Sequence, residues 1–359
     1  MKILYVDLET QWRGGQSQAL LTVRGLIARG HELALVAARS GELARRAQES
    51  GIGVMTVSAH RRRWHASRAI RRLFAETCAD IVHTNEPHAL TAAWLGQAHR
   101  KSKLVFSRRV AYPIGRGWIG RRRYLAADRI FAISKFVAES VAASGISRDR
   151  ITLVPEGVEI PVPITDAQRF EARERFRLRA GDFVFGSVGY LLPEKGHAHL
   201  LRAFAETARG NPQYKLLLAG DGPERRRLET LAVGLAVRDR VIFAGMVEKI
   251  SEVYAATDVF VFPSLAEPLG TSMLTAMAYG LPVIGIATGG VPEYVDAGVS
   301  GLLAKEASAP AIAAEMARMA QNAELRQRLG AHAREHIRDN FSADKMVENT
   351  IQAYENVLH

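Results

Sequence analysis

The sequence VFVFPSLAEPLGTSMLTAMAYG (Val259–Gly280) contains the signals that decide the fold of the second half of the chain. Its four leading apolar residues predict a buried strand, and the loop that follows leads to Thr271 and Ser272, which are favourable residues at the start of a helix. Gly280 ends this helix, and Pro282 prevents its continuation. A strand that passes through a short loop into a helix N-terminus is the repeating unit of a parallel sheet covered by helices.

Short apolar runs rich in β-branched residues alternate with longer helical patterns along most of the chain. They lie at residues 3–6, 33–36, 53–57, 81–83, 104–106, 129–133 and 151–154, and again at 183–188, 215–219, 241–243, 259–262 and 282–285. Between residues 154 and 180 the alternation stops, and three prolines precede a charged helix predicted over 166–177. From residue 310 onward the pattern predicts closing helices. The sequence therefore predicts two doubly wound α/β domains, joined by a linker, that face each other across a cleft.

The size and composition of the chain exclude several classes of protein. Its 359 residues are too many for one core, and 48% hydrophobic with 24% charged residues is a globular composition. No apolar run reaches the roughly 18–20 residues of a membrane-spanning helix, and Asp7 comes too early for a signal peptide. The single cysteine, Cys78, cannot form an internal disulfide, which fits a reducing cytosol. We expect a cytoplasmic protein.

The net charge of +11 is concentrated in the first part of the chain. Residues 1–160 contain 26 Lys and Arg against 13 Asp and Glu. The basic clusters lie at residues 61–64, 68–72, 100–103, 108–109 and 121–124, several with an aromatic neighbour. Three interpretations are open: docking to an anionic membrane surface, binding of nucleic acid, or a solvated basic face. We expect peripheral docking to the inner face of the membrane and no nucleic-acid partner, because no nucleic-acid fold signature accompanies the charge.

Glu267, Gly270 and Thr271 belong to a loop and helix start that suit an anionic ligand. The unpaired N–H groups and the positive dipole end of a helix N-terminus favour phosphate. Gly270 allows the backbone to approach a ligand closely. Glu267 has two interpretations: its carboxylate accepts hydrogen bonds from sugar hydroxyls, or it only caps the helix.

Three other loops between a strand and a helix are candidates for the same chemistry. Lys195 neutralises a phosphate in one interpretation and is an ordinary surface lysine in the other. Gly220 lies in a glycine-rich turn of a common type, and the backbone of Gly14 and Gly15 can reach a pyrophosphate. The sequence has no Walker loop, no metal-type His/Cys spacing and no G-x-S-x-G elbow, which excludes NTPases, zinc enzymes and α/β-hydrolases. We expect phosphate-sugar binding without a metal.

These segments, in their order and spacing, resemble glycosyltransferase family 4 along almost the whole chain. They are Gly14-Gly15, Glu194-Lys195-Gly196-His197, Gly220-Asp221-Gly222-Pro223-Glu224, Glu267-Pro268-Leu269-Gly270 and Gly289-Gly290-Val291-Pro292-Glu293. Each is weakly specific alone, but the ensemble is specific. The resemblance implies the GT-B fold, with Rossmann-like domains over 1–162 and 163–340 and a C-terminal helix over 341–359 that packs back on the first domain.

The resemblance also implies an activity and roles for individual residues. The activity is retaining transfer of a sugar from a nucleotide-diphosphate donor, without a metal or other cofactor. The first domain would hold the acceptor, while in the second Lys195 would bind the diphosphate and Glu267 the hydroxyls of the transferred sugar. The remaining donor-site positions are Gly14, Gly15, Gly189, Gly220, Val247, Ile250, Leu269, Gly270, Thr271 and Thr275, with Val247 and Ile250 beside the base.

Three positions depart from the family's pattern. Tyr190 stands where the family commonly has an arginine beside the diphosphate, and Thr275 stands where a second glutamate contacts the ribose. Residues 106–109 occupy the stretch in which many members carry a histidine near the transferred sugar. We hypothesise that Arg108 or Arg109 replaces both missing groups, because a guanidinium binds phosphate in a bidentate manner. Arg109 is therefore counted with Lys195 and Glu267 as a candidate catalytic residue.

The leading functional interpretation is a retaining glycosyltransferase that acts on a glycan or lipid-linked acceptor in cell-envelope polysaccharide or lipopolysaccharide synthesis. Two alternatives are open. One is a sugar-nucleotide isomerase of GT-B shape, and the other is a catalytically silent member that only binds the donor, which Tyr190 and Thr275 favour. His83, at the end of a predicted strand, is interpreted as a packed structural histidine.

Overall fold

The computed structural model describes residues 1–58, 62–115 and 117–359, so Arg61 of the first basic cluster lies outside the described residues. The chain divides into two compact units. Unit 1 comprises Met1–Gly157 with Ala343–His359, and unit 2 comprises Val158–Ser342. The first boundary expected from the sequence, at residue 162, therefore falls inside unit 2, which contains Pro161 and Pro163 of the linker segment, whereas Pro155 belongs to unit 1.

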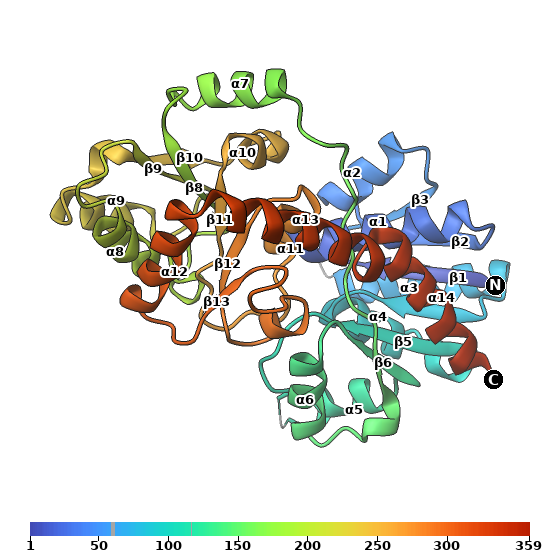
Figure 1. The fold of residues 1–359 in the computed structure, drawn as a ribbon. Coiled ribbons are helices and arrows are strands. Elements are labelled where there is room, and N and C mark those ends of the chain that lie inside the picture. Colours follow the sequence, from blue (N-terminus) through green and yellow to red (C-terminus); the bar gives the residue numbers. More distant parts are fainter. Residues whose placement is uncertain (59–61, 116) are drawn as a thin grey trace. The chain divides into compact units, whose positions relative to one another are not determined.

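Unit 1 is built on a seven-stranded parallel sheet in the order β3-β2-β1-β4-β5-β6-β7 (Figure 1). The strands are β1 (Lys2–Asp7), β2 (Glu32–Ala38), β3 (Val54–Val57), β4 (Ile81–Thr84), β5 (Lys103–Arg108), β6 (Arg129–Ala132) and β7 (Ile151–Leu153). Strands are added first on one side of β1 and then on the other. The direction of addition therefore reverses between β1 and β4, and ligands of open α/β sheets bind at the carboxyl ends of such a pair.

The helices of unit 1 include one from the far end of the chain. They are α1 (Gly14–Ala28), α2 (Glu42–Glu49), α3 (Arg62–Thr77), α4 (Pro87–Leu95), α5 (Trp118–Leu125), α6 (Lys135–Ala143) and α14 (Ala343–Leu358), with short 3₁₀ turns at Ala98–Arg100 and Arg148–Arg150. Helix α14 lies against α1 and buries Met346, Val347 and Tyr354 in a core that it shares with Ile3 and Phe131. The last helix is thus part of the core of unit 1 (Figure 1).

Unit 2 repeats this plan with a six-stranded parallel sheet in the order β10-β9-β8-β11-β12-β13. The strands are β8 (Phe183–Val188), β9 (Tyr214–Ala219), β10 (Val241–Gly245), β11 (Val259–Val261), β12 (Val283–Ile286) and β13 (Leu302–Ala304). The reversal point lies between β8 and β11. Strand β13, which pairs with β12 at the edge of the sheet, was not predicted, because its sequence Leu302-Leu303-Ala304 contains no β-branched residue.

Helices cover both faces of the second sheet. They are α7 (Asp166–Arg175), α8 (His197–Thr207), α9 (Arg225–Gly234), α10 (Ile250–Ala256), α11 (Thr271–Ala278), α12 (Ala309–Gln321) and α13 (Ala323–Asn340), with 3₁₀ turns at Pro193–Lys195, Arg238–Arg240 and Val291–Glu293. Because side chains alternate along a strand, Leu216 and Leu218 of β9 pack with α8 and α12, whereas Leu217 packs with α7 and α10 on the opposite face. Among the helices of the described residues, none is both long and apolar enough to cross a membrane.

Helix α7, predicted as a linker helix, is attached to unit 2 by an ion-pair network. The carboxylate of Asp258 accepts a hydrogen bond from the backbone N–H of Val184 at 2.7 Å and from the Arg173 guanidinium at 2.7 Å. Arg169 contacts the other oxygen of the same carboxylate. Two arginines of this helix are therefore paired within unit 2.

Candidate functional site

Unit 2 gathers most of the predicted donor-site residues along one edge of its sheet. The loops at the carboxyl ends of β10, β9, β8 and β11 follow one another in the order of the sheet. In this order they carry Val247 and Ile250, then Gly220, then Gly189 and Lys195, and finally Glu267, Leu269, Gly270 and Thr271. The reversal point of the sheet separates Lys195 from Glu267, which places these two residues where a ligand is expected.

Lys195 and Glu267 form an ion pair at this point. The Lys195 ammonium lies 2.5 Å from Oε2 of Glu267, and the same oxygen accepts a hydrogen bond from the Ser264 hydroxyl at 2.9 Å. The Lys195 side chain is 27% exposed and that of Glu267 is 11% exposed. Because the Lys195 ammonium is partly exposed, it can leave the Glu267 carboxylate and bind a phosphate. The hydrogen bond from Ser264 would continue to orient the carboxylate.

Glycines allow the two loops to approach closely enough for this pair to form. Gly196 has φ +68°, and a Cβ atom there would lie 1.9 Å from the carbonyl oxygen of Pro263. Gly289 has φ +59°, and a Cβ atom there would lie 2.2 Å from the carbonyl oxygen of Glu267. That oxygen instead accepts a hydrogen bond from the N–H of Gly290 at 2.8 Å. The glycines of two sequence motifs thus hold the backbone of Lys195 and Glu267 in place.

Helix α11 begins beside this pair without a side-chain cap. Gly270, with φ +108°, is its N-cap residue, and its first turn contains no acidic residue. Leu269 is only 2% exposed and fastens the loop to the core. The dipole of the helix is therefore not neutralised by its own first turn, which favours an anion at this end.

Tyr190 and Thr275, which stand where the family's pattern has charged residues, add no charge to this edge of the sheet. The Thr275 hydroxyl donates a hydrogen bond back to the Thr271 carbonyl oxygen at 2.8 Å, one turn earlier in α11. Tyr190, after β8, is 51% exposed. Val247 packs partly against the core, and Ile250, the first residue of α10, is 37% exposed. The two side chains predicted beside the base are thus apolar, and Thr275 has a hydroxyl where the family's pattern has a carboxylate.

His197, the first residue of α8, is a buried polar side chain close to Lys195. It is 4% exposed, its Nδ1 has no hydrogen-bond partner among the described residues, and its ring lies beside Gly189. Burial, and secondly the charge of Lys195, lower its pKa to about 4. The imidazole is therefore neutral at pH 7.

Unit 1 carries Gly14, Gly15 and Arg109 at the carboxyl edge of its own sheet. Gly14 and Gly15 are the first two residues of α1, whose first turn has no acidic residue and no side-chain cap. Arg109, after β5, donates a hydrogen bond from Nε to Glu156 at 2.8 Å and from a terminal nitrogen to Oδ1 of Asn85 at 2.5 Å. Its charge is thus compensated within unit 1, and its side chain is 15% exposed.

A buried polar network extends from Arg109 to the end of β1. The side-chain amide of Asn85 donates to Asp7 at 2.6 Å, and Gln16 donates to the same carboxylate oxygen at 3.1 Å. Burial raises the pKa of Asp7, against the opposing effect of these hydrogen bonds. The sequence patterns did not predict this network. The signal that can identify it is the Asn85-Glu86-Pro87 sequence, in which an acid precedes a proline at the start of a helix.

The two other candidates near β5 are core residues. Arg108 is 1% exposed, and its guanidinium contacts the carbonyl oxygen and the ring of Tyr112. His83 is 2% exposed, bonds Tyr354 of α14 at 2.5 Å and Ser107 at 2.8 Å, and stacks on Tyr5. Burial lowers the pKa of His83 well below its usual value, as expected of a packed neutral histidine.

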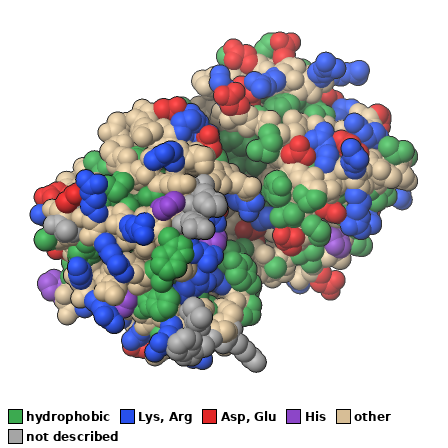
Figure 2. Space-filling view, turned by 180° about the vertical axis from the view of Figure 1, so that it is seen from behind, with side chains coloured by type: hydrophobic (Ala, Val, Ile, Leu, Met, Phe, Trp, Pro, Cys, Tyr) green, Lys and Arg blue, Asp and Glu red, His purple; other side chains and the backbone are tan. Residues whose placement is uncertain are grey.

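Apart from Arg108 and Arg109, the described Lys and Arg residues of the basic clusters of unit 1 lie at its surface, where part of their charge is used internally. Figure 2 shows Lys and Arg side chains spread over one face of the molecule among apolar ones. Arg71 donates to the carbonyl oxygen of Leu95, and Arg72 pairs with Glu76 at 3.0 Å. Trp64, on the same helix α3, is 62% exposed.

Comparison with known proteins agrees with this architecture. The model of the family "Glycosyltransferase Family 4" matches residues 12–160, and that of "Glycosyl transferases group 1" matches residues 168–336. N-acetyl-alpha-D-glucosaminyl L-malate synthase of Bacillus anthracis is 35% identical over 40% of this chain and 38% of its own length. D-inositol 3-phosphate glycosyltransferase of Geodermatophilus obscurus is 30% identical over 77% of this chain and 66% of its own length. The chain thus spans less than two thirds of the length of these curated relatives.

The structure of HepE from Anabaena, solved in complex with UDP and glucose, has the same fold. It superimposes with a TM-score of 0.87 at 19% identity, and the match covers 99% of both chains. Together with the two family models, which follow one another along most of the sequence, this places the protein. The chain belongs to glycosyltransferase family 4 and has the GT-B fold of those enzymes.

Proposed function

We propose that this protein is a retaining glycosyltransferase that transfers a sugar from a nucleotide-diphosphate donor to a hydroxyl group of a glycan or lipid-linked acceptor. The observation that carries the proposal is the Lys195–Glu267 pair, which lies at the reversal point of the second sheet beside the uncapped start of α11. In one small volume this arrangement supplies a cation and helix amides for a diphosphate, and an oriented carboxylate for sugar hydroxyls.

The chemistry follows from these roles. Lys195 and the amides of α11 stabilise the negative charge that grows on the diphosphate as its bond to the anomeric carbon breaks. Glu267, oriented by Ser264, accepts hydrogen bonds from the sugar and positions it. The acceptor oxygen forms the new bond on the face that the diphosphate leaves. The proton of the acceptor hydroxyl passes to the leaving phosphate, so that nucleoside diphosphate and glycoside are the products and no metal is required.

Binding of the donor is tested with a thermal-shift screen of UDP-, GDP- and ADP-glucose. A ligand that binds only the native state at about 100 times its Kd adds roughly 2.7 kcal/mol to the stability and raises the melting temperature. We expect one nucleotide to stabilise the protein and Lys195→Ala to lose most of this effect. No stabilisation by any of the three would remove the basis of the proposal.

The stabilising donor is then incubated with and without a membrane extract, and its products are identified. Transfer to a component of the extract with retained anomeric configuration supports the proposed reaction. Conversion of the donor into an isomeric sugar nucleotide without an acceptor identifies a sugar-nucleotide isomerase. Binding without any reaction identifies a silent donor-binding member, which the neutral residues Tyr190 and Thr275 favour.

We further propose that unit 1 docks on the cytoplasmic face of an anionic membrane, where a lipid-linked acceptor of the cell envelope is present. The supporting feature is helix α3, on which the exposed Trp64 lies among Arg63, Arg68 and Arg72. Flotation with vesicles that contain or lack phosphatidylglycerol tests it. Equal recovery in both, or no loss of recovery in Trp64→Ala, would contradict docking through α3.

A further inference from the structure

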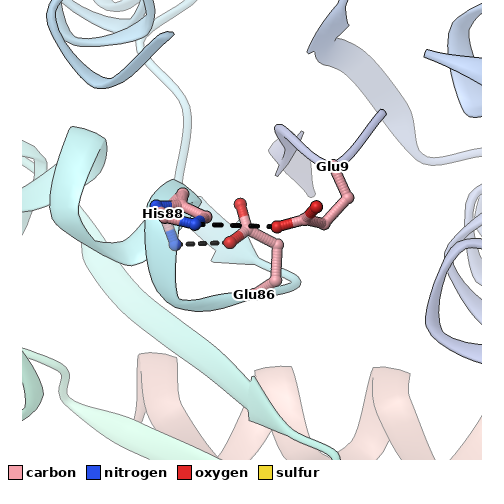
Figure 3. A group of neighbouring side chains, drawn as sticks. All are labelled: Glu9, Glu86 and His88. Atoms are coloured by element: carbon pink, nitrogen blue, oxygen red, sulfur yellow. Dashed lines mark hydrogen bonds and ion pairs between the residues drawn. The ribbon is translucent and has the colours of Figure 1, made fainter. Parts of the chain in front are cut away.

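Glu9, Glu86 and His88 converge at the carboxyl ends of β1 and β4, the reversal point of the sheet in unit 1 (Figure 3). Glu9 comes from the loop after β1, and the other two come from the turn between β4 and α4. Each offers one ligand atom, and these atoms lie within 4.8 Å of one another. None of the three side chains belongs to the predicted donor site; Glu86 is buried, and the other two are partly exposed.

Glu86 is used to build the turn. Its Oε1 accepts hydrogen bonds from the N–H groups of Leu8 at 3.2 Å and Ala89 at 2.6 Å, and its other oxygen accepts from the N–H of His88. It is therefore the N-cap of α4. Burial, and secondly the charge of Asp7, raise its pKa to about 8. Glu86 thus fixes the loops that carry the other two residues.

The tautomer of His88 is determined by Arg63. Nδ1 of His88 lies 2.9 Å from Nε and 2.7 Å from a terminal nitrogen of the Arg63 guanidinium. An arginine only donates hydrogen bonds, so Nδ1 is an acceptor and carries no proton. Burial and the charges of Arg62 and Arg63 lower the pKa of His88, so the ring is neutral and its proton is on Nε2.

The Nε2–H group of His88 faces Glu9 across a gap. Nε2 lies 3.8 Å from Oε1 of Glu9, which is too far for a direct hydrogen bond. The two side chains are 29% and 35% exposed, so the gap opens to the surface. A donor and a charged acceptor at this separation complement a hydroxyl group, whose oxygen accepts from Nε2–H and whose proton is donated to the carboxylate.

We propose that Glu9 and His88 form a hydroxyl-binding subsite that positions the acceptor in unit 1 and selects acceptors of the sugar or cyclitol class. The inference rests on the proposed function, because it concerns the acceptor of that reaction. A metal ion does not fit these residues. The proton on Nε2 occupies the lone pair that a metal needs, and the guanidinium of Arg62 lies 3.5 Å from the Glu9 carboxylate.

The test measures polyol binding separately from nucleotide binding. Methyl α-D-glucopyranoside and myo-inositol are titrated into the full-length protein, and binding is followed by saturation-transfer NMR. We expect Glu9→Ala and His88→Ala each to weaken binding by about 10-fold, the loss typical of a hydrogen bond to a charged group or its partner. His88→Gln, which keeps an N–H donor at the end of its side chain, retains part of the affinity. Glu49→Gln and His31→Ala, elsewhere in unit 1, serve as matched controls with wild-type binding.

Two further measurements identify what fails if the result differs. Stabilisation by UDP, GDP or ADP is unchanged in Glu9→Ala and His88→Ala but lost in Lys195→Ala, so failure of the donor site is visible independently. Three results would overturn the proposed subsite. The first is no binding of either polyol at about 10 mM, a concentration at which even millimolar affinities are detected. The others are wild-type binding in both alanine variants, or stabilisation of the protein by Zn²⁺ or Mn²⁺ that His88→Ala abolishes.

Discussion

Replacing Lys195 and replacing Glu267 are expected to affect nucleotide binding differently. Lys195→Ala removes the cation, and Glu267 keeps one hydrogen bond, from Ser264 at 2.9 Å. A charge-assisted bond to phosphate contributes roughly 2 kcal/mol, so we expect the affinity for nucleoside diphosphate to fall by about 30-fold. Glu267→Gln removes the competitor for the same ammonium. It therefore leaves the affinity for nucleoside diphosphate unchanged or slightly higher, while transfer of the sugar becomes slower.

The effect on stability is smaller than the effect on binding. The Lys195 side chain is 27% exposed, so the loss of its ion pair costs only about 1 kcal/mol after solvent screening. For a unit of this size that corresponds to a decrease in melting temperature of roughly 2–4 °C.

Isothermal titration calorimetry with UDP, GDP and ADP measures the affinities, and Lys305→Ala, an exposed lysine of the same unit, is the control. If Lys195→Ala and Glu267→Gln weakened binding equally, or if Lys195→Ala bound like wild type, the pair would have a structural role only and the reasoning would be refuted.

Three other predictions concern the packing and titration of buried groups. Gly196→Ala is expected to lower the free energy of unfolding by about 2 kcal/mol more than Gly210→Ala in urea denaturation: both have positive φ, but only at Gly196 does the new Cβ meet a backbone oxygen at 1.9 Å. The pKa of His197 is lowered from 6.5 to about 4 in the folded protein, so the unfolded state binds a proton at higher pH than the folded state does. The free energy of unfolding of the wild type is therefore expected to decrease by up to about 3 kcal/mol as the pH falls from 6.5 to 4. His197→Leu abolishes this loss, and parallel stability curves for the two proteins across that range would exclude it. Gly25→Ala places a Cβ 2.4 Å from Val347 and is expected to lower the free energy of unfolding by roughly 1–3 kcal/mol. Val347→Ala in the same chain is expected to restore part of this loss. An unchanged melting temperature in Gly25→Ala would contradict the close packing of α1 and α14.

The agreement between sequence and structure is best where a signal is local. Strand β8 has the bounds that its apolar run predicts, and α11 begins at Thr271 and ends before Gly280, as its start and stop residues indicate. Strand β13 was missed because it contains no β-branched residue, whereas the equally short strands β7 and β11 do and were predicted. Helix α7 was expected in a linker, yet Asp258, far away in sequence, binds it to unit 2.

The roles of the candidate site residues divide in the same way. The sequence motifs identified the loops that carry Lys195 and Glu267, and the structure places these residues, 72 positions apart in the chain, in direct contact. The contacts of Arg109 with Glu156 and Asn85, and the burial of Arg108, were not foreseen, because a run of basic residues is read as surface unless its partners are known.

The sequence by itself determined the alternation of strands and helices, the family, and the loops from which a ligand site is built. Periodicity, glycines and caps act over a few neighbouring residues and are legible in one dimension. Only the tertiary structure decided the order of the strands, and hence that the loops after β8 and β11, and those after β1 and β4, meet. The contact of Lys195 with Glu267 and the approach of His88 to Glu9 depend on how segments that are distant in the sequence pack together. No local sequence pattern encodes which distant segments become neighbours.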